Sequence, residues 1–298
     1  EKGLFTRSVK SYANINGVDL NIFFEKLFLI LKGDRVDHAE YLKSFPYVNG
    51  GLFKNIYFIP KFTKESRKLI IEAGSLDWNS INPDILGSMM QAIVQQGVRH
   101  ELGMHYTSVK NILKIIKPLF LDELNNELLN SKNDIKKLNK LLVKIYNINI
   151  FDPACGSGNF LVISYKELYK IEIEILRQLK DLDKNDWLIA KSGIELSQFF
   201  GIELDDYAHE MAKLSLWIAQ HQMNNLYEIL LNDKRSFLPL TPSGNIFCKN
   251  ANFVNWDKIC PKQKGKKIYM IGNPPYIGSS MQTKDQKKDM EIIFKNNK

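Results

Sequence analysis

The sequence predicts an α/β protein with a doubly wound parallel sheet, preceded by a mainly helical region. From about residue 146 onward, short β-branched runs typical of buried strands alternate with longer segments of helical periodicity. A glycine-rich turn follows the first of these runs, and acidic or polar residues follow the later ones. In such a sheet, ligands lie at the carboxyl ends of the strands, so the glycine-rich turn and the polar residues that follow the later strands are candidate binding sites.

Helical signals dominate the first part of the chain. Apolar spacing and capping residues predict helices over residues 19–31, over 63–73 with Thr63 as cap, from about 82, and from Thr107 or Ser108 to about 124. The lysine-rich stretch over 127–144 favours a solvated helix face over a DNA contact. We therefore predict a helical N-terminal or connector region over residues 1–95 and a sheet-containing domain over 96–298.

The alternating pattern then predicts four strands and the helices between them. The strands are expected near residues 146–150, 200–204, 245–248 and 268–272, and the helices over 165–179 and 208–219. Asp205 and Asp206, after the second strand, are expected to cap the following helix and to place a charge in its first turn.

Composition limits the compartment and the partners. The chain has 298 residues, is 44% apolar and carries a net charge of +8, which suits a polyanionic partner. Its three cysteines, Cys155, Cys248 and Cys260, form no Cys-x-x-Cys pair, so we expect no metal site, no disulfide framework and a cytoplasmic location. No apolar run is long enough to predict a membrane span. The oligomeric state stays open.

The glycine-rich turn has the chemistry of a site for a zwitterionic ligand. Gly156 and Gly158 allow a close backbone approach, the following helix offers free N–H groups, and Asp152 offers a fixed acceptor for a cation. The spacing differs from the dinucleotide motif and from a P-loop. The amino-acid end of S-adenosylmethionine, with its ammonium and carboxylate, fits this corner.

Two further polar residues follow neighbouring strands. Glu203, at the end of the second strand, can accept both hydrogens of a ribose diol. For Asn250, after the third strand, the sequence favours equally a contact with the adenine ring of the cofactor and a role in the turn itself.

Asn273-Pro274-Pro275-Tyr276 follows the fourth strand and predicts chemistry on an amine. The exocyclic amine of a base is a poor nucleophile because its lone pair is delocalised into the ring. The Asn273 side-chain oxygen and the Pro274 carbonyl, held by the stiff prolines, would accept its two hydrogens and draw the lone pair toward a methyl donor. The Tyr276 ring would stack on the base once it had left the duplex.

Together these motifs resemble those of adenine-specific, amino-methylating DNA methyltransferases, most closely the methylase part of fused type IIG/IIL restriction–modification enzymes. The strings that carry the resemblance are Asp152-Pro-Ala-Cys-Gly-Ser-Gly-Asn-Phe160, Asn273-Pro-Pro-Tyr276, Phe45-Pro-Tyr-Val-Asn-Gly-Gly-Leu-Phe53, Leu86-Gly-Ser-Met-Met-Gln91, His105-Tyr-Thr107 and Gly201-Ile-Glu-Leu-Asp205. The resemblance implies a Rossmann-like class I methyltransferase sheet that uses S-adenosylmethionine to methylate adenine in double-stranded DNA.

The same resemblance extends the set of candidate cofactor-binding residues. It places Tyr106 and Thr107 over the methionine end of the cofactor, although Ser108 stands where the family usually has proline. It also adds Pro153, Ala154, Phe160 and Leu204.

Two departures from the family pattern shape the expectations for this chain. The family sheet has seven strands and a target-recognition domain beyond them, whereas this chain ends soon after the fourth strand, so we expect residues 1–298 alone to be inactive. No nuclease-like acid cluster with Glu-x-Lys is visible. The alternatives that stay open are a methyltransferase acting on protein glutamine or RNA, and a non-catalytic cofactor-binding fragment.

Overall fold

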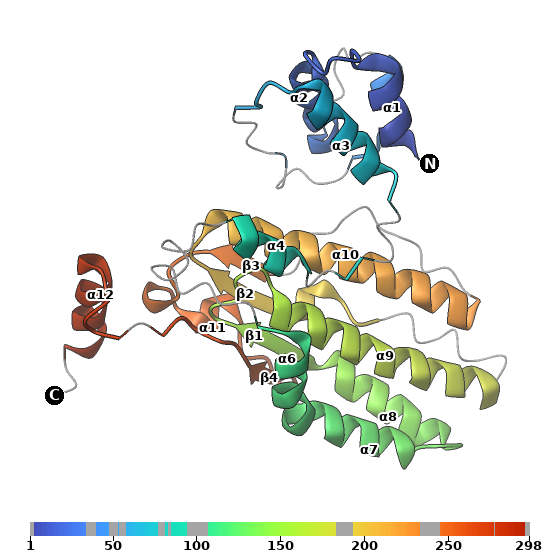
Figure 1. Ribbon diagram of the computed structural model, residues 1–298. Coiled ribbons are helices and arrows are strands. Elements are labelled where there is room, and N and C mark those ends of the chain that lie inside the picture. Colours follow the sequence, from blue (N-terminus) through green and yellow to red (C-terminus); the bar gives the residue numbers. More distant parts are fainter. Residues whose placement is uncertain are drawn as a thin grey trace. The chain divides into compact units, whose positions relative to one another are not determined.

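The structure is a computed structural model of the 298-residue chain (Figure 1). It describes residues 3–33, 40–47, 53, 58–76, 81–82, 85–93, 107–182, 193–232, 245–276 and 278–295. The chain forms two compact units, with the main boundary between Ser80 and Ile81. Among the described residues, no helix combines the length and the apolar composition needed to cross a membrane.

The first unit is helical, as its sequence pattern predicts. It contains α1 (Leu4–Tyr12), α2 (Leu20–Lys32), a short 3-10 helix (Glu40–Leu42) and α3 (Lys64–Gly74). The Thr63 side chain caps α3 by accepting from the Ser66 N–H, and buried Phe23 and Leu27 of α2 lie in the core. Residues 48–52 of the string that carries the family resemblance over 45–53 lie outside the described residues.

The second unit carries the sheet and the remaining helices. Its elements are α4 (Ile85–Ile93), α6 (Val109–Ile116), a π-helical segment (Lys117–Leu121), α7 (Asp122–Leu129), α8 (Ile135–Tyr146), β1 (Ile148–Asp152), α9 (Asn159–Leu182), a 3-10 turn (Leu196–Gln198), β2 (Phe199–Glu203), α10 (Asp206–Leu231), β3 (Asn245–Cys248), a 3-10 turn (Ala251–Phe253), α11 (Trp256–Ile259), β4 (Lys267–Met270) and α12 (Lys284–Phe294).

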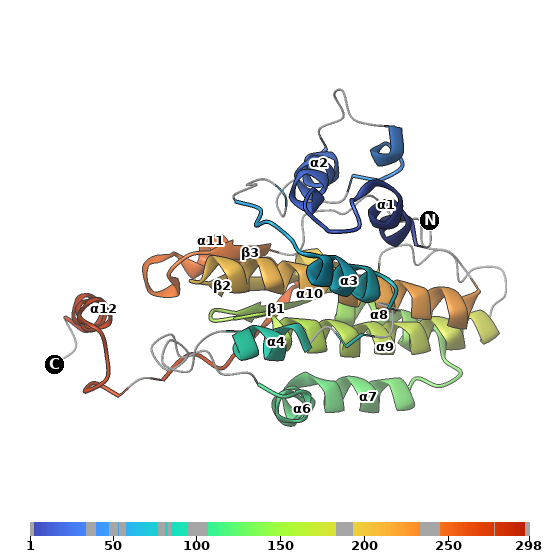
Figure 2. The same cartoon turned by 45° about the horizontal axis from the view of Figure 1, so that its top comes forward.

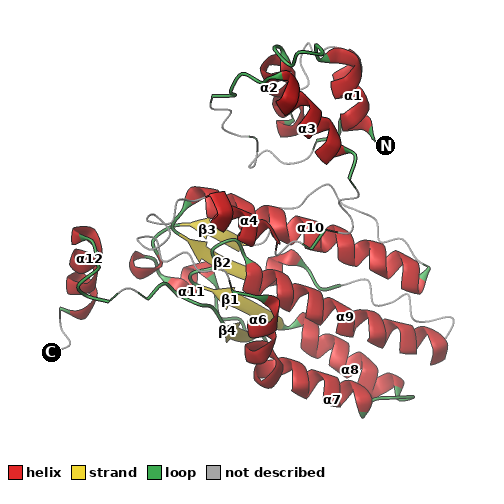
Figure 3. Ribbon diagram, in the orientation of Figure 1, coloured by secondary structure: helices red, strands yellow, loops and turns green. Residues whose placement is uncertain are grey.

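The four strands form one parallel sheet in the order β3-β2-β1-β4 (Figure 3). Helices cover both of its faces, with α9 and α10 on one side and α11 on the other (Figure 2). On one face of the sheet Phe151 packs with Ile202 and Ile259. On the other face the Phe199 ring packs against the Tyr165 ring of α9, with 5.4 Å between the ring centroids. The predicted doubly wound α/β fold is confirmed.

Several boundaries differ from those predicted, among them the start of α9 at Asn159 rather than near residue 165. The first strand begins at Ile148 because α8 continues to Tyr146, with Ile145 buried on its apolar face. The helix predicted to end near 124 continues to Leu129 through a π-helical segment at Pro118, which has no N–H to donate. Finally, α10 extends to Leu231, well beyond the predicted end at 219.

Candidate functional site

The site is built around the turn between β1 and α9. Gly156 and Gly158 have φ values of 53° and 84°, which L side chains rarely adopt. A Cβ on Gly158 would approach that of Ala212 at 3.1 Å, so this glycine allows the turn to pack on α10. A Cβ on Gly156 would meet nothing within 4 Å, so the backbone there faces open space where a ligand has room.

Asp152 ends β1 and lies beneath this turn, 1% exposed. Its Oδ1 accepts from the Ala154 N–H at 3.0 Å, whereas its Oδ2 is buried with no hydrogen-bond partner. Burial raises the pKa of this carboxyl to about 7, and the negative charge of Glu203 adds to the effect. A buried acceptor without a donor is a site where a cationic or hydrogen-donating ligand group would be stabilised.

Glu203, at the end of β2, is tied to the glycine turn. Its Oε2 accepts from the Gly156 N–H at 2.8 Å, and its Oε1 accepts from the N–H groups of Leu204 and Asp205, both at 2.9 Å. The Asp205 carboxylate also caps α10 through the Ala208 N–H at 2.7 Å, as predicted. The ends of the two central strands therefore form one hydrogen-bonded edge.

The adenine-side candidates lie farther along the same edge. Leu204 is 65% exposed and offers an apolar surface beside Glu203. Asn250 caps the turn after β3, because its Oδ1 accepts from the Asn252 N–H, and its Nδ2 donates to the Asp289 carboxylate of α12, both at 3.0 Å. The turn role that we weighed for Asn250 is therefore present in the structure.

The Asn-Pro-Pro-Tyr segment begins directly beside Asp152. A Cβ built on Gly272 would lie 2.5 Å from the Asp152 Oδ1, so only glycine fits before Asn273. The Asn273 Nδ2 donates to the Thr107 Oγ1 at 3.2 Å, which joins two segments 166 residues apart. Tyr276 is 92% exposed, with its ring open to solvent. The structure thus groups Asp152, Asn273 and Thr107.

Other candidate residues have different surroundings. Pro153 and Ala154 are half-buried in the turn, and Phe160 is 4% exposed in the first turn of α9, inside the core. Ser108 begins α6 without a side-chain cap bond. Tyr106 lies outside the described residues.

The structure adds one positioning residue that the sequence argument did not single out. Gly87 of α4 packs against the glycine turn, where any Cβ would collide with the Ser157 Oγ and would lie 3.1 Å from the Asn159 Nδ2. The signal in the sequence was a glycine inside a helical segment, which weakens a helix unless packing requires it.

Cys155 lies inside the turn but lacks the character of a nucleophile. It is 6% exposed, and burial together with Asp152 and Glu203 raises the pKa of its thiol well above the ordinary value. A thiol held in the protonated form is unreactive.

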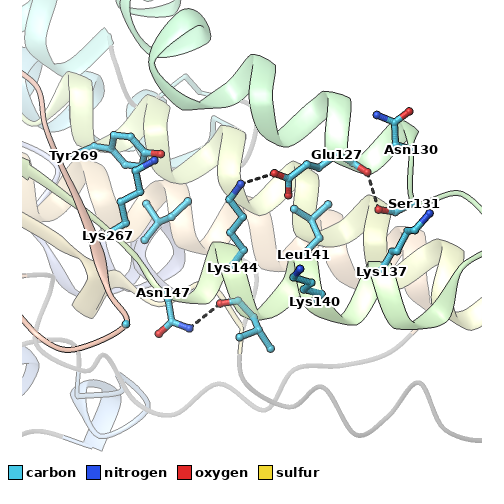
Figure 4. A pocket seen from close by; sticks show the side chains of 13 residues that line it. Glu127, Asn130, Ser131, Lys137, Lys140, Leu141, Lys144, Asn147, Lys267 and Tyr269 are labelled. Atoms are coloured by element: carbon cyan, nitrogen blue, oxygen red, sulfur yellow. Dashed lines mark hydrogen bonds and ion pairs between the residues drawn. The ribbon is translucent and has the colours of Figure 1, made fainter.

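The lysine-rich stretch lies away from this edge, at the other end of β1. Lys137, Lys140 and Lys144 of α8 line a pocket of about 700 Å³ that also includes Lys267 (Figure 4). Lys144 pairs with Glu123 at 2.6 Å and with Glu127 of α7. This ion pairing agrees with the predicted solvated helix face.

The parallel sheet, the glycine turn beside an acid and the Asn-Pro-Pro-Tyr segment at the same edge define a Rossmann-like methyltransferase fold. Residues 128–298 match the family described as "MmeI, DNA-methyltransferase domain". The chain belongs to this family of DNA methyltransferase domains of restriction–modification enzymes.

Two relatives match most of this chain. DNA methyltransferase A of Bacillus subtilis (strain 168) is 50% identical over 297 residues, which is 99% of this chain and 34% of that protein. A putative type II restriction enzyme and methyltransferase of Methanocaldococcus jannaschii is 31% identical over 72% of this chain and 21% of its own length. The chain therefore spans about a third or less of these relatives.

A solved structure supports the same assignment. The type IIL restriction–modification enzyme MmeI, determined in complex with DNA, matches with a TM-score of 0.87 and 38% sequence identity. The match covers 99% of this chain and 40% of the MmeI chain.

Proposed function

We propose that this chain forms the cofactor-binding part of a site-specific DNA methyltransferase, which transfers a methyl group from S-adenosylmethionine to the exocyclic amine of adenine within a restriction–modification system. The observation that carries the proposal is the contact of Gly272 with Asp152. It brings the amine-methylating segment against the corner that suits the amino-acid end of the cofactor. The family membership and the names of the relatives support the same reaction.

The residues of the turn fit the cofactor. The unpartnered Asp152 Oδ2 would hold the ammonium, and the open backbone face at Gly156 would receive the chain that leads to the sulfonium. When bound, S-adenosylmethionine supplies the methyl group from its sulfonium. Leu204 offers the adenine an apolar contact.

Glu203 has fewer acceptor positions left for the ribose hydroxyls than the sequence suggested. A carboxylate has about four acceptor positions, and backbone N–H groups occupy three of those of Glu203. One position on Oε2 is left for a ribose hydroxyl. Accepting both hydroxyls would require release of a backbone N–H.

Asn273 would orient and activate the target amine. Because its Nδ2 is engaged by Thr107, its Oδ1 is left to accept a hydrogen from the amine, with the Pro274 carbonyl as the second acceptor. Proline has no N–H and a fixed φ, so these acceptors are held before the base arrives. The exposed Tyr276 ring would stack on the flipped adenine.

The partner in this proposal is double-stranded DNA, and its sequence would be read by a target-recognition domain elsewhere in a longer protein. The relatives are about three times the length of this chain or longer, which supports this division. We therefore expect residues 1–298 alone to be inactive on DNA. Labelled methyl groups appearing in RNA or in protein glutamine, and not in DNA, would favour the alternative substrate class.

The test uses Asn273→Ala in the longest native chain that contains these residues. We expect the methylation rate to fall about a hundred- to a thousandfold, the usual effect of removing one preorganised acceptor. Cofactor affinity by calorimetry should stay within about twofold, because the amide faces the target. Asn126→Ala, on the exposed face of α7, is the matched control. An unchanged rate would refute the role of Asn273.

Tyr276 gives a second, separable readout. Tyr276→Ala should weaken capture of the flipped base by about 1–3 kcal/mol, the usual worth of a base–aromatic stack. Tyr276→Phe keeps the ring and should change little. Equal losses in the two variants would show that the hydroxyl, and not the ring, matters.

A further inference from the structure

A second group of ligand-type side chains lies where β3 meets α10. Asp206 and His209 stand one turn apart at the start of α10, and Cys248 is the last residue of β3. One ligand atom from each lies within 4.8 Å of the others. The parallel pairing of β2 with β3, which sets Glu203 opposite Cys248, brings these distant parts of the sequence together.

The surroundings of the two ring nitrogens of His209 indicate that this group of side chains binds a ligand. The residue is 7% exposed, and its Nε2 lies 3.2 Å from the Ile246 carbonyl oxygen, which can only accept. The Nε2 is therefore the ring nitrogen that donates, which leaves Nδ1 as the nitrogen that would bind a ligand. That Nδ1 is buried and has no hydrogen-bond partner.

The neighbours of this nitrogen are negative. The Asp206 Oδ1 lies 3.9 Å from it and the Glu210 Oε1 lies 3.2 Å away, outside hydrogen-bonding geometry. Glu210 also pairs with Lys213 through Oε1, and its Oε2 is buried without a partner. Negative charge gathered around a buried ring nitrogen is offset when a cation binds between them.

We propose that Asp206, His209 and Cys248 bind a zinc ion. Sulfur, imidazole nitrogen and a carboxylate oxygen are the donors that zinc prefers, whereas magnesium and calcium prefer oxygen alone. Binding converts the Cys248 thiol to a thiolate, releasing one proton to solvent as the Zn–S bond forms. Water takes the fourth position. The carbonyl of Ile246 acts as the outer partner that orients the His209 ring.

The surrounding acids agree with this inference. The carboxylates of Asp206, Glu203 and Asp205 surround the Cys248 sulfur with negative charge, which a bound cation would offset. The zinc ion would join the end of β3 to the first turn of α10, next to Glu203. Our expectation of no metal site rested on cysteine spacing, which cannot reveal ligands assembled across a sheet edge.

The test uses the full chain, stripped with a chelator and titrated with Zn²⁺ alone. We expect one zinc per chain by elemental analysis. With free zinc at a hundred times its dissociation constant, we expect a rise in melting temperature of about 5–10 °C. Co²⁺ in place of zinc should give a thiolate charge-transfer band.

The variants separate a built site from a general affinity for zinc. Cys248→Ser and Asp206→Asn change exposed residues, so both should fold, and both should lose the stoichiometric zinc and the thermal shift. His221→Asn, also on α10 but outside the group, should behave as the wild type. Zinc uptake that Cys248→Ser leaves unchanged, or no uptake by the wild type, would overturn the proposal.

Discussion

Replacing Asp152 with asparagine should separate what this residue does for the ligand from what it does for stability. Its carboxyl is fully buried, its Oδ2 has no partner, and its pKa is raised to about 7. Asp152→Asn keeps the shape of the side chain and an oxygen to accept from the Ala154 N–H. It removes only the charge.

The sign and size of the effect follow from proton linkage. The ordinary pKa of this group is 3.8, so between pH 3.8 and about 7 the unfolded chain ionises Asp152 while the folded protein keeps it protonated. Its contribution to stability is present in full below pH 3.8 and is lost as the pH rises to about 7. The interval is roughly three pH units, and at 1.36 kcal/mol each the loss is about 4 kcal/mol.

Thermal unfolding of the wild type and of Asp152→Asn at pH 5 and pH 8, without cofactor, measures this loss. The variant should gain stability over the wild type on going from pH 5 to pH 8. Only about two of the three pH units lie between pH 5 and pH 7, so the expected gain is about 2.7 kcal/mol, which for a unit of about 200 residues corresponds to a rise of about 5–11 °C in melting temperature. Asp181→Asn, on the exposed last turn of α9, is the control and should show no such gain.

The same variant should bind S-adenosylmethionine about 10- to 150-fold more weakly, the usual loss for a hydrogen bond to a charged group. If the stability difference between the variant and the wild type were the same at pH 5 and at pH 8, the buried carboxylate would not be a source of instability. A variant with unchanged cofactor affinity would refute its role as the ammonium partner. The two conclusions can therefore fail separately.

Three further outcomes can be checked on the same edge of the sheet. The affinity of the wild type for S-adenosylmethionine should rise by up to about tenfold per pH unit below pH 7 and level off above it, because only ionised Asp152 pairs with the ammonium. An affinity that calorimetry finds constant from pH 5.5 to 8.5 would contradict this. Gly272→Ala should lower stability by about 1–3 kcal/mol through its clash with Asp152, measured by denaturant unfolding, and should be harmless in an Asp152→Ala background. Cys155→Ala should keep most of the methylation activity of the longest native chain, since the thiol is buried and protonated; a thousandfold loss in a folded variant would reveal a covalent step.

Local chemistry explains why much of the site could be predicted from sequence alone. A positive φ requires glycine wherever it occurs, so Gly156 and Gly158 reveal their turn without any knowledge of the fold. The caps of Thr63 and Asp205 act within three residues and follow the same logic. The alternation of strands and helices likewise determined the α/β class, because each pattern has its own period.

Contacts between distant segments were decided by the tertiary structure. The strand order β3-β2-β1-β4 places Gly272 against Asp152 and sets the end of β3 beside the start of α10. The raised pKa of Asp152 and the lack of a hydrogen-bond partner at the His209 Nδ1 both follow from burial, which depends on everything packed around a residue. A sequence determines which groups are available, whereas their desolvation and their distances arise only when the sheet brings remote strand ends to one edge.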